Sequence, residues 1–189
     1  MALHRVTSPL DEKIIAGLRA GDSVEISGII YTARDAAHER LVEAITRNGE
    51  LPFDLRGQTI YYMGPSPTPP GRVIGACGPT TSGRMDAFTP AMLEAGVKAL
   101  VGKGERSEAV RAALRKHRAV YLVTYGGAGA LLAHTVIKAE VLAYPELGAE
   151  AVMRLEVKDL PAIVADDIYG GDLFQREIAK YKKNDDNQD

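Results

Sequence analysis

The sequence has few of the side chains that bind metals or cross-link a chain. Among its 189 residues there is one cysteine, and there are only four histidines. A single cysteine excludes an internal disulfide, and it excludes an iron–sulfur cluster held by several thiolates of this chain alone. No two of the histidines have the i, i+4 spacing that places two ligands on one helix face: His4, His38, His117 and His134. We therefore expect no metal site built by this chain, and we interpret Cys77 as a small buried residue.

A strong net charge and a long apolar run are also absent. The net charge is -2 and the isoelectric point is about 6.1, so there is no electrostatic footprint for nucleic acid or for an anionic membrane surface. The longest run of apolar and glycine residues, Gly126 to Ala133, is well short of the roughly 20 residues that cross a bilayer. Residues 1–7 have no apolar block behind them that would indicate a secretory signal. We expect a soluble, cytoplasmic protein.

What is present is an alternation of strand and helix patterns that suits one α/β domain over residues 1–189. Hydrophobic residues make up 46% of the chain, enough for one substantial core. The patterns predict strands over 24–30, 59–63, 72–77, 99–101, 119–124, 152–157 and 162–167, and helices over 35–45, 89–96, 107–114 and 126–136. The last two strands follow one another without a helix, which favours a mixed sheet with flanking helices. The polar end, 176–189, is expected to fray.

The turn from Gly78 to Asp86 concentrates backbone donors, hydroxyls and a guanidinium in nine residues, GPTTSGRMD. Its proline and glycines indicate a shaped turn in which three successive hydroxyls could face one ligand. Arg84 would add a planar fork that matches a carboxylate. The alternative is an ordinary turn before a helix, capped by Thr81 or Ser82.

Arg34, Arg84 and Lys103 each lie in a turn of small residues after an apolar strand. If those strands are parallel, their turns meet at one edge of the sheet, and three cations there would suit a small dicarboxylate. If the turns are scattered, each cation is only a solvated side chain. Asp35 is expected to cap the following helix, and His38 could either bond Asp35 or take part in proton transfer.

Four segments of the chain together resemble class I fumarate hydratase, in its C-terminal or beta part: 29–40, 78–86, 102–104 and 144–148. The same region occurs in the beta subunit of L-tartrate dehydratase, and the resemblance extends from about residue 10 to residue 174. It implies a swivelling beta/beta/alpha domain, which is compatible with the mixed order of elements.

The resemblance further implies an oxygen-sensitive hydro-lyase that interconverts fumarate and L-malate. In that family a catalytic 4Fe-4S cluster is held by three cysteines of a separate alpha subunit, and its unique iron acts as a Lewis acid on the substrate. The single cysteine here agrees with that division. The implied partner is therefore an alpha subunit that carries the cluster, in a hetero-oligomer.

By the same resemblance, the carboxylate-binding cations are Arg34, Arg84 and Lys103, the proton-transfer residue is Thr80, and the supporting residues are Asp35, His38, Thr81 and Ser82. An unperturbed hydroxyl is a poor base, so the role of Thr80 requires nearby cations that stabilise an alkoxide. A Thr80 that only donates a hydrogen bond is the alternative.

Two other functions stay open. Residues 33–38, 82–86 and 162–167 look closer to fumarases than to tartrate dehydratases, which usually have cysteines near the first of these motifs. Both substrates are four-carbon dicarboxylates, so L-tartrate remains an alternative. A non-catalytic module that binds a dicarboxylate or assists assembly is another, and association with a cysteine-bearing partner would discriminate it from an enzyme subunit.

Overall fold

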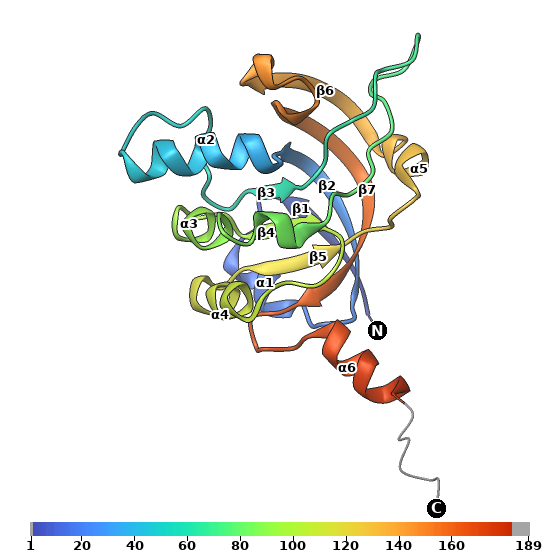
Figure 1. Ribbon diagram of the computed structural model, residues 1–189. Helices are drawn as coiled ribbons and strands as arrows, with labels where there is room; N and C mark the ends of the chain where they lie inside the picture. Colours follow the sequence, from blue (N-terminus) through green and yellow to red (C-terminus); the bar gives the residue numbers. More distant parts are fainter. Residues whose placement is uncertain (1, 183–189) are drawn as a thin grey trace, which may run out of the picture.

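The computed structural model describes residues 2–182 (Figure 1). Its strands are β1 (Leu3–Ser8), β2 (Ser23–Thr32), β3 (Thr59–Tyr61), β4 (Ala99–Gly102), β5 (Val120–Val123), β6 (Val136–Ala143) and β7 (Val152–Asp166). Its α-helices are α1 (Glu12–Gly17), α2 (Asp35–Thr46), α3 (Thr89–Glu94), α4 (Glu108–His117), α5 (Gly129–Ala133) and α6 (Leu173–Tyr181), and short 3-10 helices are η1 (Ser82–Met85) and η2 (Pro145–Glu150).

The strands form one mixed sheet in the order β1-β2-β3-β4-β5-β7-β6. Neighbours from β1 to β5 are parallel, whereas β7 runs antiparallel to β2, β5 and β6. Because β7 pairs with both β5 and β2, the sheet partly closes on itself. The predicted mixed α/β fold with flanking helices is confirmed.

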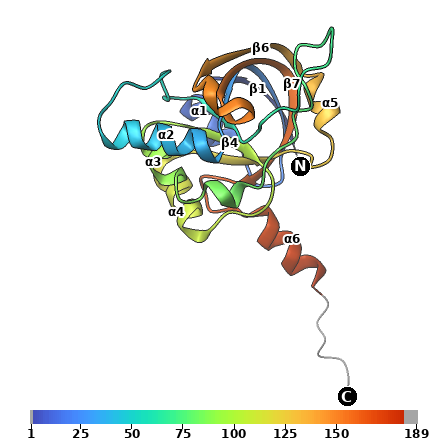
Figure 2. The ribbon, with the colours of Figure 1, turned by 45° about the horizontal axis from the view of Figure 1, so that its top comes forward.

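Two hydrophobic clusters lie on the two faces of the sheet. Ile60, Leu100 and Tyr121 belong to the cluster shared with α2, α3 and α4, whereas their neighbours Tyr61 and Val101 belong to the cluster inside the partly closed sheet. Figures 1 and 2 both show α2, α3 and α4 on one side of the sheet and α5 on the other. Successive side chains of a strand point to opposite faces, so strands buried on both faces are apolar throughout.

The predicted strand over 72–77 is wrong. Its apolar residues Ile74 and Cys77 are buried, but the segment is irregular and bonds to other loops and to α5: Cys77 N donates to the carbonyl of Gly129 at 2.9 Å. The apolar pattern therefore reflects packing without a strand partner. Ser66 helps to hold this path, because its hydroxyl accepts a hydrogen bond from Ala76 N at 2.9 Å.

Three further differences concern other helices and strands. The sequence patterns did not predict β1 and α1, and the expected helix over 126–136 is shorter, since Val136 already begins β6. The two strands expected over 152–157 and 162–167 are one strand, β7. The residues between them form a bulge rather than a turn: Asp159 has a φ of 54° and its amide donates to the Ser27 hydroxyl at 3.0 Å.

The polar end of the chain is helical over its first part. Asp172 caps α6 by accepting a hydrogen bond from Gln175 N at 3.0 Å, so the helix covers residues 176–181 of the segment expected to fray. The remainder of that expectation, for 183–189, lies outside the described residues. None of the helices within residues 2–182 combines the length and the apolar character that a membrane span requires.

Candidate functional site

The predicted site segments meet at one edge of the sheet, where β2, β3 and β4 end. The turn over 78–86 runs between the ends of β3 and β4, because Thr80 N donates to the Tyr62 carbonyl at 2.7 Å and Thr81 forms a parallel bridge with Lys103. Parallel neighbours end at the same edge, so the residues after β2 join this cluster. The turn thus occupies the expected edge, although it does not follow a strand over 72–77.

Arg84 connects this turn to α2. Its Nε donates to Oδ1 of Asp35 at 2.9 Å, and the Arg84 side chain is 52% exposed. Among residues 2–182, the two terminal nitrogens of Arg84 make no hydrogen bond, so this part of the fork is open to a ligand. The expected capping role of Asp35 is wrong: Arg34 is the N-cap of α2, and Asp35 is its first residue. Glu150 instead accepts a hydrogen bond from Ala36 N at 3.0 Å.

Arg34 is more enclosed than Arg84, since its side chain is 21% exposed against 52% for Arg84. Its Nη2 lies 3.4 Å from Oε1 of Glu150. A Cβ on Gly64 would lie 2.9 Å from Nη1 of Arg34 and 2.5 Å from the Ala149 carbonyl oxygen, so glycine is required at that position for the guanidinium to fit. The Nε atom of Arg34 is buried and has no hydrogen-bond partner among the described residues. The Arg34 guanidinium is therefore confined by Gly64 and Glu150, and its Nε is a donor without a partner among the described residues.

His38 supports the backbone of Arg34. It does not make the hydrogen bond to Asp35 that was one of its two expected roles. The ring is fully buried, and Nδ1 lies 2.9 Å from the carbonyl oxygen of Arg34. A carbonyl only accepts, so Nδ1 carries the hydrogen and Nε2 presents a lone pair. Burial lowers the pKa of His38 to about 4, which keeps the ring neutral. The ring packs edge-on to Tyr62 with centroids 5.3 Å apart. This geometry favours a supporting role over proton transfer.

The three hydroxyls of the turn do not share one direction. Thr80 is partly buried and Thr81 is exposed, but Ser82 is fully buried and turned inward. The Ser82 hydroxyl accepts from Lys103 N at 3.1 Å, and Ser82 N donates to the Lys103 carbonyl at 2.9 Å. A Cβ on Gly102 would overlap the Ser82 hydroxyl, so this close approach requires glycine at the end of β4. Thr81 precedes η1 without making a side-chain cap.

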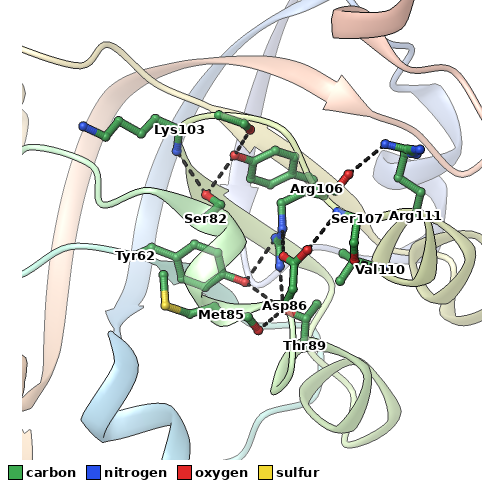
Figure 3. Close-up of polar contacts among 12 residues, drawn as sticks. Tyr62, Ser82, Met85, Asp86, Thr89, Lys103, Arg106, Ser107, Val110 and Arg111 are labelled. Atoms are coloured by element: carbon green, nitrogen blue, oxygen red, sulfur yellow. Dashed lines mark hydrogen bonds and ion pairs between the residues drawn. The ribbon is translucent and has the colours of Figure 1, made fainter.

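A buried polar network behind this turn escaped the sequence analysis. Its centre is Arg106, which is 3% exposed and pairs with Asp86 at 2.7 Å (Figure 3). The Tyr62 hydroxyl accepts from Arg106, and the Tyr121 hydroxyl is hydrogen-bonded to Ser82. Hydrophobic patterning does not reveal a buried arginine. The only feature of the sequence that pointed to this network was Asp86, the last residue of the turn over 78–86.

The described part of the chain does not group ligands for an iron–sulfur cluster. Within residues 2–182 no three His, Cys, Asp or Glu side chains are grouped as a metal site. Cys77 is buried, and burial raises the pKa of its thiol to about 11, so the thiolate that would bind iron is disfavoured. These residues do not fit a 4Fe-4S cluster.

Chemically, the site is a sheet edge that carries three cations and the hydroxyl of Thr80. Lys103 is exposed, the Arg84 side chain is 52% exposed, the Arg34 side chain is 21% exposed, and Thr80 lies on the same turn as Arg84. Such an arrangement can bind a small dianion through charge-assisted hydrogen bonds. Excluding water from the bound ion requires a cover.

Comparison with known proteins shows which family this chain is similar to. A family model described as Fumarase C-terminus matches residues 3–177. The chain is 42% identical over 163 residues to "Fumarate hydratase class I, anaerobic" of Escherichia coli (strain K12), covering 85% of this chain and 30% of that protein. It is 40% identical over 161 residues to "Fumarate hydratase 2" of Leishmania major, covering 84% and 28%.

A third relative matches this chain over nearly its own full length. "Putative L(+)-tartrate dehydratase subunit beta" of Methanocaldococcus jannaschii is 38% identical over 181 residues, which cover 92% of this chain and 93% of that protein. The chain thus spans about 30% of the length of the fumarate hydratases it matches and nearly all of a relative named as a beta subunit.

Proposed function

The chain belongs to the fumarase C-terminus family, and on this premise we propose that it is the beta subunit of an iron–sulfur-dependent class I fumarate hydratase. Such an enzyme interconverts fumarate and L-malate. The name of one relative supports a subunit, because the M. jannaschii protein that matches this chain is named as a beta subunit. The remaining part of the longer fumarate hydratases would correspond to a separate alpha subunit.

The observation that carries the proposal is that the segments carrying Arg34, Arg84 and Lys103 reach one edge of the sheet. Three segments reach that edge, and the contacts between Arg84 and Asp35 and between Thr81 and Lys103 hold them together. In the proposed complex, the two carboxylates of the substrate bind these cations. The free end of the Arg84 fork suits bidentate binding of one carboxylate.

Thr80 is the proposed proton carrier. Hydration adds the oxygen of water to one alkene carbon and a proton to the other, and the reverse reaction removes the proton from C3 of malate. The Thr80 backbone is held by the Tyr62 carbonyl, and its side chain is partly buried beside the cationic segments. A cationic surrounding favours the alkoxide form of a hydroxyl and would assist Thr80 as a base.

The 4Fe-4S cluster belongs, in this proposal, entirely to the alpha subunit. The buried Cys77 and the lack of a ligand group within residues 2–182 support that assignment. The alpha subunit would also cover the sheet edge that carries the three cations. We place the complex in the cytoplasm, where thiolates stay reduced.

Recovery of the affinity-tagged chain from its native host without oxygen tests the proposal. We expect an iron–sulfur partner to co-purify and the complex to form malate from fumarate, measured by the loss of fumarate absorbance. An intact complex with its cluster that does not form malate would contradict the assignment to fumarate. Recovery of the chain without a partner would instead favour a non-catalytic dicarboxylate-binding or assembly module.

L-tartrate is the second candidate substrate, because the relative with the same extent as this chain is named a tartrate dehydratase subunit. The same preparation should therefore be offered L-tartrate, whose dehydration yields oxaloacetate. Oxaloacetate formation without malate formation would assign the chain to the tartrate branch.

A further inference from the structure

The side chain of Arg106 is enclosed by protein and makes three polar contacts (Figure 3). Its Nε donates to Oδ1 of Asp86 at 2.7 Å, its Nη2 to the Thr89 hydroxyl at 2.6 Å, and its Nη1 to the Tyr62 hydroxyl at 3.3 Å. A buried charge is unfavourable unless its donors are paired, and removal of one partner is strongly destabilising. This guanidinium is thus held in one orientation by Asp86 and Thr89 on one side of the turn and by Tyr62 after β3.

The surroundings of Arg106 require a guanidinium and not merely a positive charge. Its central carbon lies 5.0 Å from the ring centroid of Tyr121 and 5.4 Å from that of Tyr62. A planar fork can face aromatic rings while it donates in three directions, whereas an ammonium group is a compact point charge. Lysine at this position would keep the charge and lose the geometry.

The contacts of Arg106 connect the segment that carries Arg84 to the segment that carries Lys103. Asp86 binds Arg106 through Oδ1 and Ser107 N through Oδ2 at 2.8 Å. The Thr89 hydroxyl accepts from Arg106 and donates to the carbonyl of Met85, the last residue of η1, at 2.8 Å. The end of η1 and the start of α3 are therefore attached to the turn after β4.

A second attachment lies on the other side of Arg84. Ser82 N donates to the Lys103 carbonyl at 2.9 Å, and Lys103 N donates to the Ser82 hydroxyl at 3.1 Å. Arg84 lies between the two attachments, at Ser82 and Asp86. We define the clamp as these two attachments together; its residues are Ser82, Asp86, Thr89, Lys103, Arg106 and Ser107.

We propose that Arg106 is a positioning residue, which sets the separation of Arg84 and Lys103 through the clamp and thereby the affinity for a dicarboxylate. Arg106 is buried, so it acts through the other two cations and does not touch the substrate. The inference rests on the proposed function, because it assigns these cations to substrate binding. It adds a buried residue to a site whose other cations reach the surface.

The test is a double-mutant cycle in the recovered complex. Arg106→Lys should raise KM for fumarate by at least about tenfold, because charge-assisted contacts of this kind are each strong enough for such a change. In an Arg84→Ala background, the same substitution should raise KM by less than about twofold, since one of the two cations whose separation Arg106 sets is already absent. Equal effects in both backgrounds, or an unchanged KM in a folded Arg106→Lys complex, would overturn the proposal.

A matched control separates positioning from stability. Ser8→Ala removes a buried hydrogen bond in which the Ser8 hydroxyl donates to the Thr59 hydroxyl at 3.0 Å. Thr59 is the first residue of β3, at the opposite end of that strand from the site. It should lower the melting temperature and leave KM unchanged. If Ser8→Ala raises KM as Arg106→Lys does, loss of stability explains both and positioning is refuted.

A milder pair of variants covers the case in which Arg106→Lys does not fold. Thr89→Val removes the acceptor of Arg106 Nη2, whereas Thr89→Ser keeps a hydroxyl. We expect the valine variant to raise KM severalfold and the serine variant to remain within about twofold of the original chain. Equal KM values for the two variants would contradict the role of this contact.

Amide hydrogen exchange in the full chain measures the clamp without any activity. Arg106→Lys should accelerate exchange at Ser82 and Lys103 by at least about tenfold and leave the core amide of Leu122 unchanged. If the wild-type complex turns over no fumarate, the proposed function fails, and these exchange rates still test the clamp. Unchanged exchange at Ser82 and Lys103 would overturn it.

Discussion

Replacing Arg84 with alanine should reduce catalysis much more than it reduces stability. The Arg84 side chain is 52% exposed and its partner Asp35 is 31% exposed, with 2.9 Å between Nε and Oδ1. An ion pair this exposed contributes no more than about 1 kcal/mol to the free energy of unfolding. For a domain of this size, such a loss lowers the melting temperature by about 2–4 °C.

The expected loss of activity follows from the role proposed for the free end of the fork. A charge-assisted contact between a guanidinium and a substrate carboxylate is worth about 2–3 kcal/mol. Removing it should therefore lower kcat/KM by about 30- to 150-fold. Two assays on one preparation measure the separation: steady-state hydration of fumarate by the complex, and thermal unfolding of the same complex.

Arg47→Ala is the matched control for this prediction. Arg47 is also an exposed arginine in a surface ion pair, since its Nη1 lies 2.8 Å from Glu43 on α2, but it lies at the far end of that helix. It should show a similarly small change in melting temperature and unchanged kcat/KM. Near-wild-type turnover by Arg84→Ala, or an equal loss of activity in Arg47→Ala, would refute the reasoning.

Three other substitutions give independent tests. Gly102→Ala would force the Ser82 hydroxyl away from Lys103 N, so we expect a loss of about 1–3 kcal/mol in stability together with a raised KM, measured by thermal unfolding and steady-state kinetics. Thr80→Val should lower kcat by at least about 100-fold if its hydroxyl transfers the proton, whereas Thr80→Ser should retain most of the activity; equal rates would leave Thr80 without a chemical role. Burial, reinforced by the nearby Asp172 carboxylate, raises the pKa of Asp166 to about 7. The unfolded chain loses this proton near pH 4, so the folded chain holds more protons between pH 4 and 7 and its stability falls as the pH rises through that range. Asp166→Asn should therefore be more stable than the original chain above pH 7, by on the order of 2 kcal/mol, and the difference should vanish below pH 4 in melting curves.

Much of the fold could be predicted because its signals are local. The helix predicted over 107–114 is α4, which Ser107 caps by accepting from Val110 N, and the strand patterns found most of the sheet. The apolar strands β3, β4 and β5 are buried on both faces, which accounts for their continuous hydrophobic character. Their parallel arrangement was enough to bring the turns after β2 and β4 to one edge.

Local signals failed where an apolar residue has a partner other than a strand. Ile74 and Cys77 pack against the core from an irregular segment, so their hydrophobicity indicates burial and not strand structure. The edge strand β6 is apolar in sequence at six of its eight residues, yet five of the eight are exposed, and the sequence patterns did not predict this strand. Asp159 and the residues around it have turn composition, but they form a bulge because β2 pairs with β7 on both sides of it.

The sequence by itself determined the alternation of strands and helices, the short turns with their cations, and the absence of thiolates for a cluster. These properties depend on composition and on neighbours a few residues away. Only the tertiary structure decided that Ser82 points inward to Lys103, that His38 supports the Arg34 carbonyl, and that Arg106 is buried against Asp86. The direction of a polar side chain depends on partners far away in sequence, which supply the hydrogen bonds that repay its loss of water.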